Sequence, residues 1–284
     1  MMAMSRYRTF STSVAHLKSL RFAETIKEAS KPPLTESIKV SKPFGVERGT
    51  VLNHKSSGFG GLTHELFSSE AKERRQKRLD HDIAHSPFYE SKSFNNTKGK
   101  IFTPPISFFR SDKSKYFPDF SSSTLTKKSQ LFYELLQNKI SFVRIYSTVS
   151  GEKCADSYFD RDGKNYLKQD YTEMVERYPH AQMIDINIPQ SFVKGLFVKL
   201  AESNLRAQLP NERHNLYYIV PESLFPYDIK QKLLCDNTCS GYIYLVDHQG
   251  RIRWATSGSA NDSEVELMWK CLKGLEKEYA LLSQ

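Results

Sequence analysis

The sequence has no apolar run long enough to cross a membrane. A membrane-spanning helix needs about 18 or more consecutive apolar residues. The two most apolar stretches, Ile140 to Tyr146 and Tyr242 to Val246, have only the length of a strand. The chain is therefore not expected to span a membrane by itself. It can still build a sizeable core, because 39% of its 284 residues are hydrophobic and it holds 18 Phe and 15 Tyr.

Cysteines are few, and none of them belongs to a Cys-x-x-Cys pair. The four are Cys154, Cys235, Cys239 and Cys271. So few cysteines in a chain of this length do not make a disulfide framework, and a reduced compartment fits such usage. The sequence leaves open whether any of these thiols has a redox role.

Acidic residues are absent from the first 23 positions, which hold four basic residues and several Ser and Thr. Wound as a helix, this segment places Phe10, Val14 and Leu17 on one face. A basic, hydroxylated, amphipathic and acid-poor segment is typical of a mitochondrial transit peptide, although a simple basic tail has a similar composition. We therefore expect residues 1 to 45 to comprise a mitochondrial presequence and a disordered linker.

Positive charge is concentrated in the front of the chain. Residues 1 to 130 hold 23 Lys and Arg against 12 Asp and Glu, a net charge of +11, whereas residues 131 to 284 hold 18 against 20, a net charge of −2. A basic arm can meet anionic lipid headgroups, nucleic acid or an acidic protein surface, or can simply keep the chain soluble. A nucleic-acid partner is not predicted, because the basic residues are not grouped with a recognisable RNA-binding module.

Charged residues at four-residue spacing predict a helix over residues 64 to 85, which is ended by Pro87. Its apolar face is thin, so this helix needs a partner or lies on a surface. It carries a basic cluster that we expect to lie near lipid headgroups. The cluster consists of Arg74, Arg75, Lys77 and Arg78.

Residues 98 to 120 combine six aromatic residues with three prolines. The prolines disfavour a helix or a central strand, while each ring left in water forgoes about 2 kcal/mol of burial free energy. Two explanations are open. The segment wraps over the globule and buries its own rings, or the rings form a docking surface for a protein or for lipid headgroups. With the preceding helix, this segment makes up a predicted region at residues 46 to 125.

From residue 126 to residue 284 the pattern becomes a regular alternation of strands and helices. Strands are predicted at residues 139–147, 184–188, 216–220, 241–247 and 251–255, and helices at residues 163–177, 192–206, 226–234 and from a cap at Ser263 onward. Glu266 would complete a capping box with Ser263. An early strand–helix–strand followed by a closing hairpin and a final helix predicts an α/β, thioredoxin-like domain, with a mixed sheet flanked by helices on both faces.

The apparatus of thiol chemistry is missing from this predicted domain. A thioredoxin-like oxidoreductase needs a low-pKa thiolate at the start of the helix after the first strand, but that place reads Ser147 to Lys153 without a cysteine. Ser240-Gly241 stands where a proline would precede the hairpin. A matrix thiol-dependent peroxidase or reductase using Cys154 alone is the alternative that stays open, although a lone cysteine is more often a small buried hydrophobe.

Metal motifs are incomplete as well. Cys235 and Cys239 stand four residues apart, but a structural zinc site needs four ligands and no second pair lies at a suitable spacing. His81-Asp82-Ile83-Ala84-His85 imitates a zincin helix, yet it has Asp in place of Glu and Pro87 ends the helix at once. We expect no metal, no cofactor and no catalytic residues, and therefore a binding role.

Several separate motifs resemble the mitochondrial ATP synthase assembly factor ten family, over roughly residues 62 to 280. They are Arg78-Leu79-Asp80-His81, Gly99-Lys100-Ile101-Phe102 with Pro104-Pro105, Phe109-Arg110, Tyr116-Phe117-Pro118, Gly241 to Asp247, and Arg251-Ile252-Arg253-Trp254. Several motifs at compatible spacing are more specific than one short match.

The resemblance implies a non-catalytic chaperone, peripheral on the matrix side of the mitochondrial inner membrane. Its client would be newly made subunit 6 (subunit a) of the Fo sector, which it would help to assemble with the ring of subunit 9 (subunit c). A holder of apolar helices needs exposed aromatic surface. We expect the client contacts to be Phe102, Phe108, Phe109, Tyr116 and Phe117.

Overall fold

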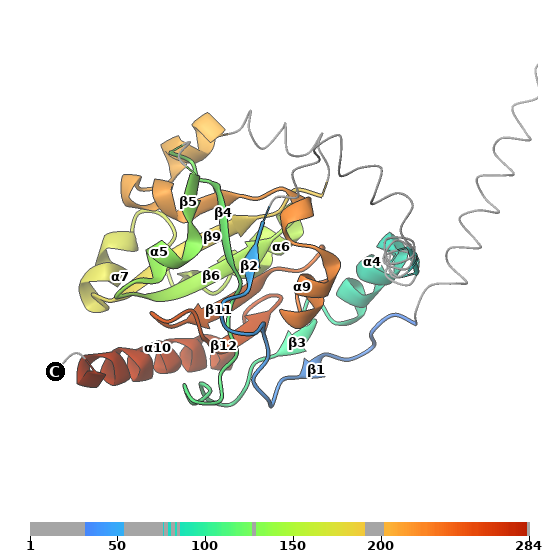
Figure 1. The fold of residues 1–284 in the computed structure, drawn as a ribbon, viewed down its shortest axis with the longest axis horizontal. Coiled ribbons are helices and arrows are strands. Elements are labelled where there is room, and N and C mark those ends of the chain that lie inside the picture. The colour runs from blue at the N-terminus through green and yellow to red at the C-terminus, as the bar shows by residue number, and fades with distance from the viewer. Residues whose placement is uncertain are drawn as a thin grey trace, which may run out of the picture.

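The computed structural model describes residues 32–53, 76, 79–80, 83, 86–126, 129–190 and 202–282. Its centre is one five-stranded sheet with helices on both sides, and the last helix runs along one edge of the view to the C-terminus (Figure 1). None of the helices within the described residues combines the length and the apolarity needed to cross a bilayer.

The central sheet has the strand order β10-β9-β6-β11-β12. Its strands are β6 (Ile140–Tyr146), β9 (Ala181–Asn187), β10 (Tyr217–Ile219), β11 (Tyr242–Val246) and β12 (Ile252–Ser257). The first three are parallel, and β11 runs antiparallel to β6 and to β12. In the middle of the sheet Val143 faces Ile184 on one side and Tyr244 on the other. The predicted thioredoxin-like arrangement is confirmed.

Each face of the sheet is covered, so nearly all strand residues are buried, including polar ones such as Gln182, Asp185 and Arg253. One face packs against α6 (Val149–Asp156), α7 (Tyr171–Arg177) and α10 (Asp262–Leu282). The other packs against α5 (Phe132–Leu136), α9 (Tyr227–Lys232) and the N-terminal segments. A small hairpin of β7 (Asp160–Arg161) and β8 (Lys164–Asn165) follows α6, and short 3-10 turns lie at Asn211–Leu216 and Glu222–Leu224.

The segment before the sheet is part of the same core. Its elements are β1 (Ile38–Lys39), β2 (Val51–Leu52), α4 (Pro87–Asn96), β3 (Phe102–Thr103), β4 (Asp119–Ser123) and β5 (Ser129–Leu131). β1 pairs with β3, and β2 pairs with β4, which pairs with β5. Val40 and Val46 are buried. The expected disordered linker is therefore wrong for residues 32–45, because their apolar side chains pack on the domain.

Most predicted elements occur, with shifted ends. α6 was not predicted, and the helix expected at residues 163–177 is confined to α7 because a hairpin takes its first part. The last helix begins at Asp262 rather than after Ser263, since Asn261 Oδ1 accepts a hydrogen bond of 2.9 Å from Glu264 N. Most of the helices expected at residues 64–85 and 192–206 lie outside the described residues.

Candidate functional site

The start of α6 is the place where a thioredoxin-like enzyme would hold its reactive thiol. Here Thr148 caps the helix, and its Oγ1 accepts a hydrogen bond of 3.2 Å from Gly151 N. The backbone of Gly151 lies directly against the loop before β11. A Cβ atom on Gly151 would lie 2.5 Å from Ser240 O, and one on Gly241 would lie 2.0 Å from Gly151 O. Only glycine fits at both positions, so main chain packs against main chain here, while the Val149 side chain in the same turn is 68% exposed.

The segment from residue 86 to residue 100, here named the cover segment, is fastened to that same loop. The Glu90 carboxylate accepts hydrogen bonds from Thr238 N at 3.0 Å and from Thr238 Oγ1. Asn237 Nδ2 donates to Glu90 O at 2.9 Å, and Ser240 Oγ donates to Gly99 O at 2.7 Å. Burial raises the pKa of Glu90. The cover segment is thus held against the loop that contacts the start of α6.

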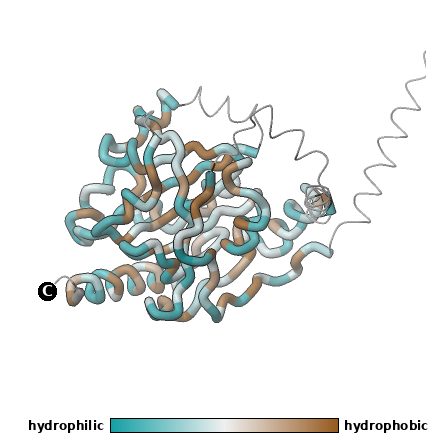
Figure 2. The backbone as a smooth tube through the Cα atoms, viewed as in Figure 1, coloured by the Kyte–Doolittle hydropathy of each residue, from teal (hydrophilic) through white to brown (hydrophobic). Residues whose placement is uncertain are grey.

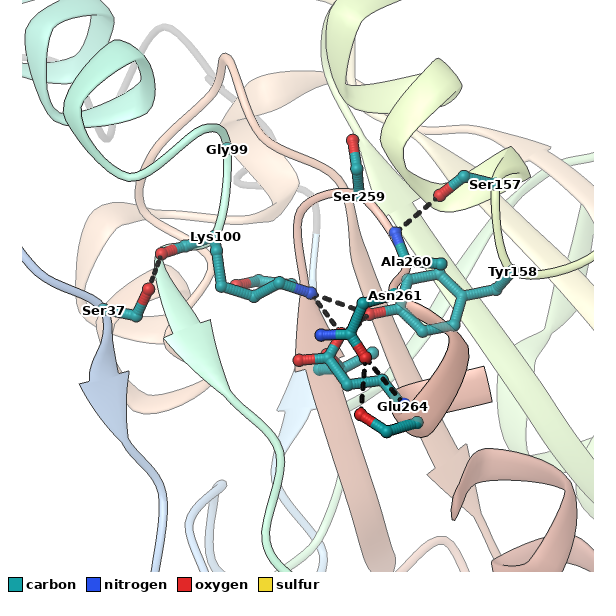
Figure 3. A network of polar contacts seen from close by, with 12 residues as sticks. Ser37, Gly99, Lys100, Ser157, Tyr158, Ser259, Ala260, Asn261 and Glu264 are labelled. Carbon is teal, nitrogen blue, oxygen red and sulfur yellow. Dashed lines mark hydrogen bonds and ion pairs between the residues drawn. The ribbon is translucent and has the colours of Figure 1, made fainter. Parts of the chain in front are cut away.

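The end of the cover segment is tied to the domain by a buried polar network (Figure 3). Lys100 Nζ forms an ion pair with Glu264 in the first turn of α10 and donates a hydrogen bond of 2.9 Å to Tyr158 Oη. Tyr158 Oη donates in turn to Glu264 Oε2 at 2.7 Å and lies 2.9 Å from Thr256 Oγ1. We call Lys100, Tyr158 and Glu264 the clasp.

The clasp is shielded from solvent. The Lys100 and Glu264 side chains are 13% and 9% exposed, and Tyr158 is 1% exposed. Burial lowers the pKa of Lys100, against the opposing effect of Glu264, and burial raises the pKa of Tyr158. A lysine whose ammonium is held by a carboxylate and a phenol in this way joins two parts of the chain.

Cys154 lies beside the clasp but away from the start of α6. Its side chain is buried, and its Sγ accepts a hydrogen bond of 3.4 Å from Ser259 Oγ. A Cβ atom on Gly99 would lie 3.3 Å from this sulfur, so the cover segment passes directly over it. The thiol is therefore packed under main chain.

Two of the other cysteines are also poor nucleophiles. Burial raises the pKa of Cys235 to about 12 and that of Cys271 to about 11, which leaves little thiolate at neutral pH. Cys239 is partly buried. Within the described part of the chain, no three His, Cys, Asp or Glu residues gather in a way that could hold a metal ion.

The aromatic residues expected to contact a client lie mostly in the core. Phe102 and Phe117 are fully buried and Phe109 is 9% exposed, while Phe108 and Tyr116 are partly buried. The prediction that all five rings form an exposed surface is therefore wrong for Phe102, Phe109 and Phe117. The other explanation for this segment is the one observed, namely that it wraps over the globule and buries its rings.

These rings are buried because their segment covers the edge of the sheet at β12. Phe102 N donates to Ser257 Oγ at 2.8 Å, and Ser257 Oγ donates to Phe102 O at 2.9 Å. Further on, Phe109 N donates to Arg253 O at 2.6 Å, and Phe117 N donates to Gly250 O at 2.8 Å. Residues 102–117 thus satisfy the hydrogen bonds of an edge strand that would otherwise be open to pairing with another chain. The basic cluster of Arg74, Arg75, Lys77 and Arg78 lies outside the described residues.

Sequence reasoning missed a second buried network. Arg144 Nη1 donates to Asp185 Oδ1 at 2.6 Å, and Arg213 also pairs with Asp185. Arg144 pairs with Asp156 as well. All but Asp156 are almost completely buried. The alternation of Asp185 with isoleucines predicted the strand, but no sequence signal linked it to arginines 41 and 28 residues away.

Comparison with protein families gives one match over most of the chain. The model of the family described as ATP10 protein matches residues 24–275. Three curated relatives carry the name "Mitochondrial ATPase complex subunit ATP10". The relative from Saccharomyces cerevisiae is 31% identical over 261 residues, which cover 90% of this chain and 93% of the relative.

The other two relatives give similar values. The one from Candida glabrata is 33% identical, covering 95% of this chain and 96% of the relative. The one from Eremothecium gossypii is 33% identical, covering 78% of this chain and 79% of the relative.

Solved structures similar to this one come from thiol–disulfide proteins. A DsbF homologue from Corynebacterium diphtheriae has a TM-score of 0.38 at 12% identity, covering 59% of this chain and 92% of that chain. A DsbE-type protein from Chlorobium tepidum has a TM-score of 0.39 at 11% identity, covering 57% and 96%. Likeness at this level says nothing about activity.

Proposed function

Because this chain belongs to the ATP10 protein family, we propose that it acts without catalysis as an assembly factor of the mitochondrial ATP synthase. In this proposal it binds newly made subunit 6 (subunit a) of the Fo sector and promotes its assembly with the subunit 9 (subunit c) ring. It is imported by its basic N-terminal segment and works peripherally on the matrix side of the inner membrane.

One observation carries the non-catalytic part of the proposal. No cysteine stands at the start of α6, where the main chain of Gly151 packs against that of Gly241 and the cover segment is fastened to the adjoining loop. A thiol enzyme needs an exposed, activated sulfur at this position. A domain without a cysteine at this position lacks the reactive group of such an enzyme, which suits a protein that works by binding.

The client surface must then lie elsewhere than on the buried rings. Of the five aromatic residues first considered, Phe108 and Tyr116 keep part of their surface exposed and remain candidates for contact with the client. The basic cluster of Arg74, Arg75, Lys77 and Arg78 remains a candidate for contact with lipid headgroups.

Deletion of the gene tests the assembly role. We expect cells without the protein to accumulate F1 while subunit 6 fails to join the subunit 9 ring, as seen on native gels with radiolabelled mitochondrial translation products. Tagged protein should also co-purify newly made subunit 6. A fully assembled ATP synthase in the deleted cells would refute the proposal.

A variant with all four cysteines replaced by alanine tests the non-catalytic part. Alanine avoids placing a hydroxyl in the core, and we expect this variant to restore ATP synthase in deleted cells. The alternative function, a thiol-dependent peroxidase or reductase, draws on the hydrogen bond from Ser259 to Cys154. It predicts that Cys154→Ala alone abolishes rescue although the variant accumulates to normal levels, while Cys271→Ala, at another buried thiol, rescues fully.

A further inference from the structure

Helix α10 carries a row of three exposed lysines on its outer side. Lys270, Lys273 and Lys277 are spaced by three and four residues and therefore share one face of the helix. We call them the lysine row. None of them forms an ion pair with another residue in the described ranges. Two carboxylates lie beside the row: the exposed Glu266, one turn before Lys270, and Glu276, three residues after Lys273, which accepts a hydrogen bond from His180 N. Figure 2 shows hydrophilic and hydrophobic residues interleaved along this helix.

The loop at residues 104–110 crosses α10 beside this row. The Phe108 ring lies over Gly274, so closely that a Cβ atom there would be 2.5 Å from Phe108 Cε1. Lys270 lies four residues before Gly274 and Lys277 three residues after it. These separations correspond to about 6 Å and about 4.5 Å along the helix axis. The loop and the lysine row therefore belong to one surface.

The loop presents an isoleucine to solvent from a fixed frame. Trp254 Nε1 donates to Pro105 O at 3.3 Å, and Arg253 Nε donates to Phe109 O at 2.8 Å, so both sides of the loop are anchored to β12. Between these anchors Ile106 is 94% exposed. Leu281, one turn after Lys277 on the same face of α10, is 74% exposed. Two large aliphatic side chains thus stand in water, one on α10 after the lysine row and one on the loop that packs on this helix through Phe108.

We propose that the lysine row, Ile106 and Leu281 dock the protein on a bilayer that carries anionic headgroups. Such a bilayer offers negative charge at its surface and an apolar layer just beneath, which match the lysines and the two aliphatic side chains. An acidic protein segment would complement the lysines but not a protruding isoleucine on a fixed loop. The inference rests on the proposed function for the identity of the membrane, the mitochondrial inner membrane.

Flotation of the purified full chain with lipid vesicles tests this surface. The probes are vesicles of phosphatidylcholine alone and of phosphatidylcholine with about one quarter cardiolipin. Each lysine close to an anionic surface strengthens binding about fivefold. Changing the whole lysine row to glutamine should therefore weaken binding to the cardiolipin vesicles about a hundredfold. Ile106→Ser should weaken it about fivefold, because the isoleucine is only partly inserted.

A matched control makes the same charge change on three other helices. Lys92 on α4, Lys153 on α6 and Lys232 on α9 are exposed, and changing them to glutamine should weaken binding less than threefold. The proposal would be overturned if both triple variants lost the same affinity for cardiolipin vesicles. It would also be overturned if the unaltered chain bound neutral vesicles as tightly as cardiolipin vesicles. Thermal unfolding of each variant establishes that it is folded.

Acylation of lysines, followed by mass spectrometry, locates the contact in the unaltered chain. The basic N-terminal segment also attracts anionic vesicles, but this readout is specific to each lysine. Vesicles should protect the lysine row at least fivefold more than the control lysines. Equal protection of both sets on bound protein refutes the surface. Protection by an added acidic peptide and not by vesicles would indicate a protein partner and refute it too. Because only lipid and purified protein are present, the result is independent of whether ATP synthase assembly depends on the protein.

Discussion

The clasp makes a quantitative prediction about how firmly the cover segment is held. Lys100→Met keeps most of the volume and the apolar stem of the side chain but removes the charge. Glu264→Gln keeps the shape and removes the opposite charge. Both groups are well buried, with side chains 13% and 9% exposed, so solvent screening reduces their interaction only slightly. The two single variants and their combination form a double-mutant cycle.

The two single substitutions should lower the free energy of unfolding by different amounts, because each leaves a different charged group buried. Removing one member of a buried ion pair costs about 3–5 kcal/mol. After Lys100→Met, Glu264 still accepts a hydrogen bond from Tyr158 and lies in the first turn of α10, where the helix dipole favours a negative charge, so we expect about 3 kcal/mol. After Glu264→Gln, Lys100 can avoid burying an unpaired charge by losing its proton. With an ordinary pKa of 10.5 this costs about 4 kcal/mol at pH 7.5, which sets the upper limit.

Urea unfolding of the purified protein, followed by tryptophan fluorescence and far-ultraviolet circular dichroism, measures these free energies. Hydrogen exchange in residues 86–103 reports separately on release of the cover segment. The double variant should lose only about 1–2 kcal/mol, because it leaves no buried charge without a partner. A double variant as unstable as the sum of the two singles would refute the reasoning, and so would single variants within 0.5 kcal/mol of the parent protein, the usual range for surface changes.

Three further predictions follow from the same contacts. Gly151→Ala should lower the free energy of unfolding by several kcal/mol, because its Cβ would lie 2.5 Å from a carbonyl oxygen. Gly163→Ala, in open space at φ +77°, should cost only about 1–2 kcal/mol of backbone strain in the same urea assay. Phe117→Ser should destabilise the protein by about 3–5 kcal/mol and Phe108→Ser by less than half as much, since only Phe117 is fully buried. Burial raises the pKa of Glu90 above its ordinary value of 4.5, so this group lowers the stability of the folded chain as pH rises above 4.5; Glu90→Gln should therefore become more stable relative to the parent protein as pH rises above 4.5, in parallel urea titrations.

The strands β6 and β11 could be predicted from the sequence because the sheet is buried on both faces, so that β11 is an unbroken apolar run and β6 is interrupted only by Ser141 and Arg144. α6 could not, because its first turn holds Val149, Ser150 and Gly151, which are weak helix formers. It is helical because Thr148 caps it and because the sheet packs against its buried side. The local sequence pattern does not show such support from tertiary packing.

The clasp shows the same limit for the site. Lys100 and Glu264 are separated by 164 positions, and each looks like an ordinary surface charge in its own neighbourhood. The absence of a thiol at the start of α6 could be seen from the sequence, but the backbone contact between Gly151 and Gly241 beside it could not. The aromatic segment was ambiguous for a related reason. Whether its rings are buried depends on an edge strand more than 130 residues further along the chain.

These contacts explain how a thioredoxin-like sheet can serve as a platform for binding. An edge strand and an open helix start are the two features of such a domain that most readily accept another chain or a substrate. In this protein residues 102–117 cover the edge strand β12, and the cover segment is fastened to the loop beside the start of α6. What stays exposed is therefore set by the turns of these segments, such as the loop that presents Ile106. A partner must be recognised through those turns and the outer faces of the helices, and substitutions there should alter binding while leaving the free energy of unfolding almost unchanged.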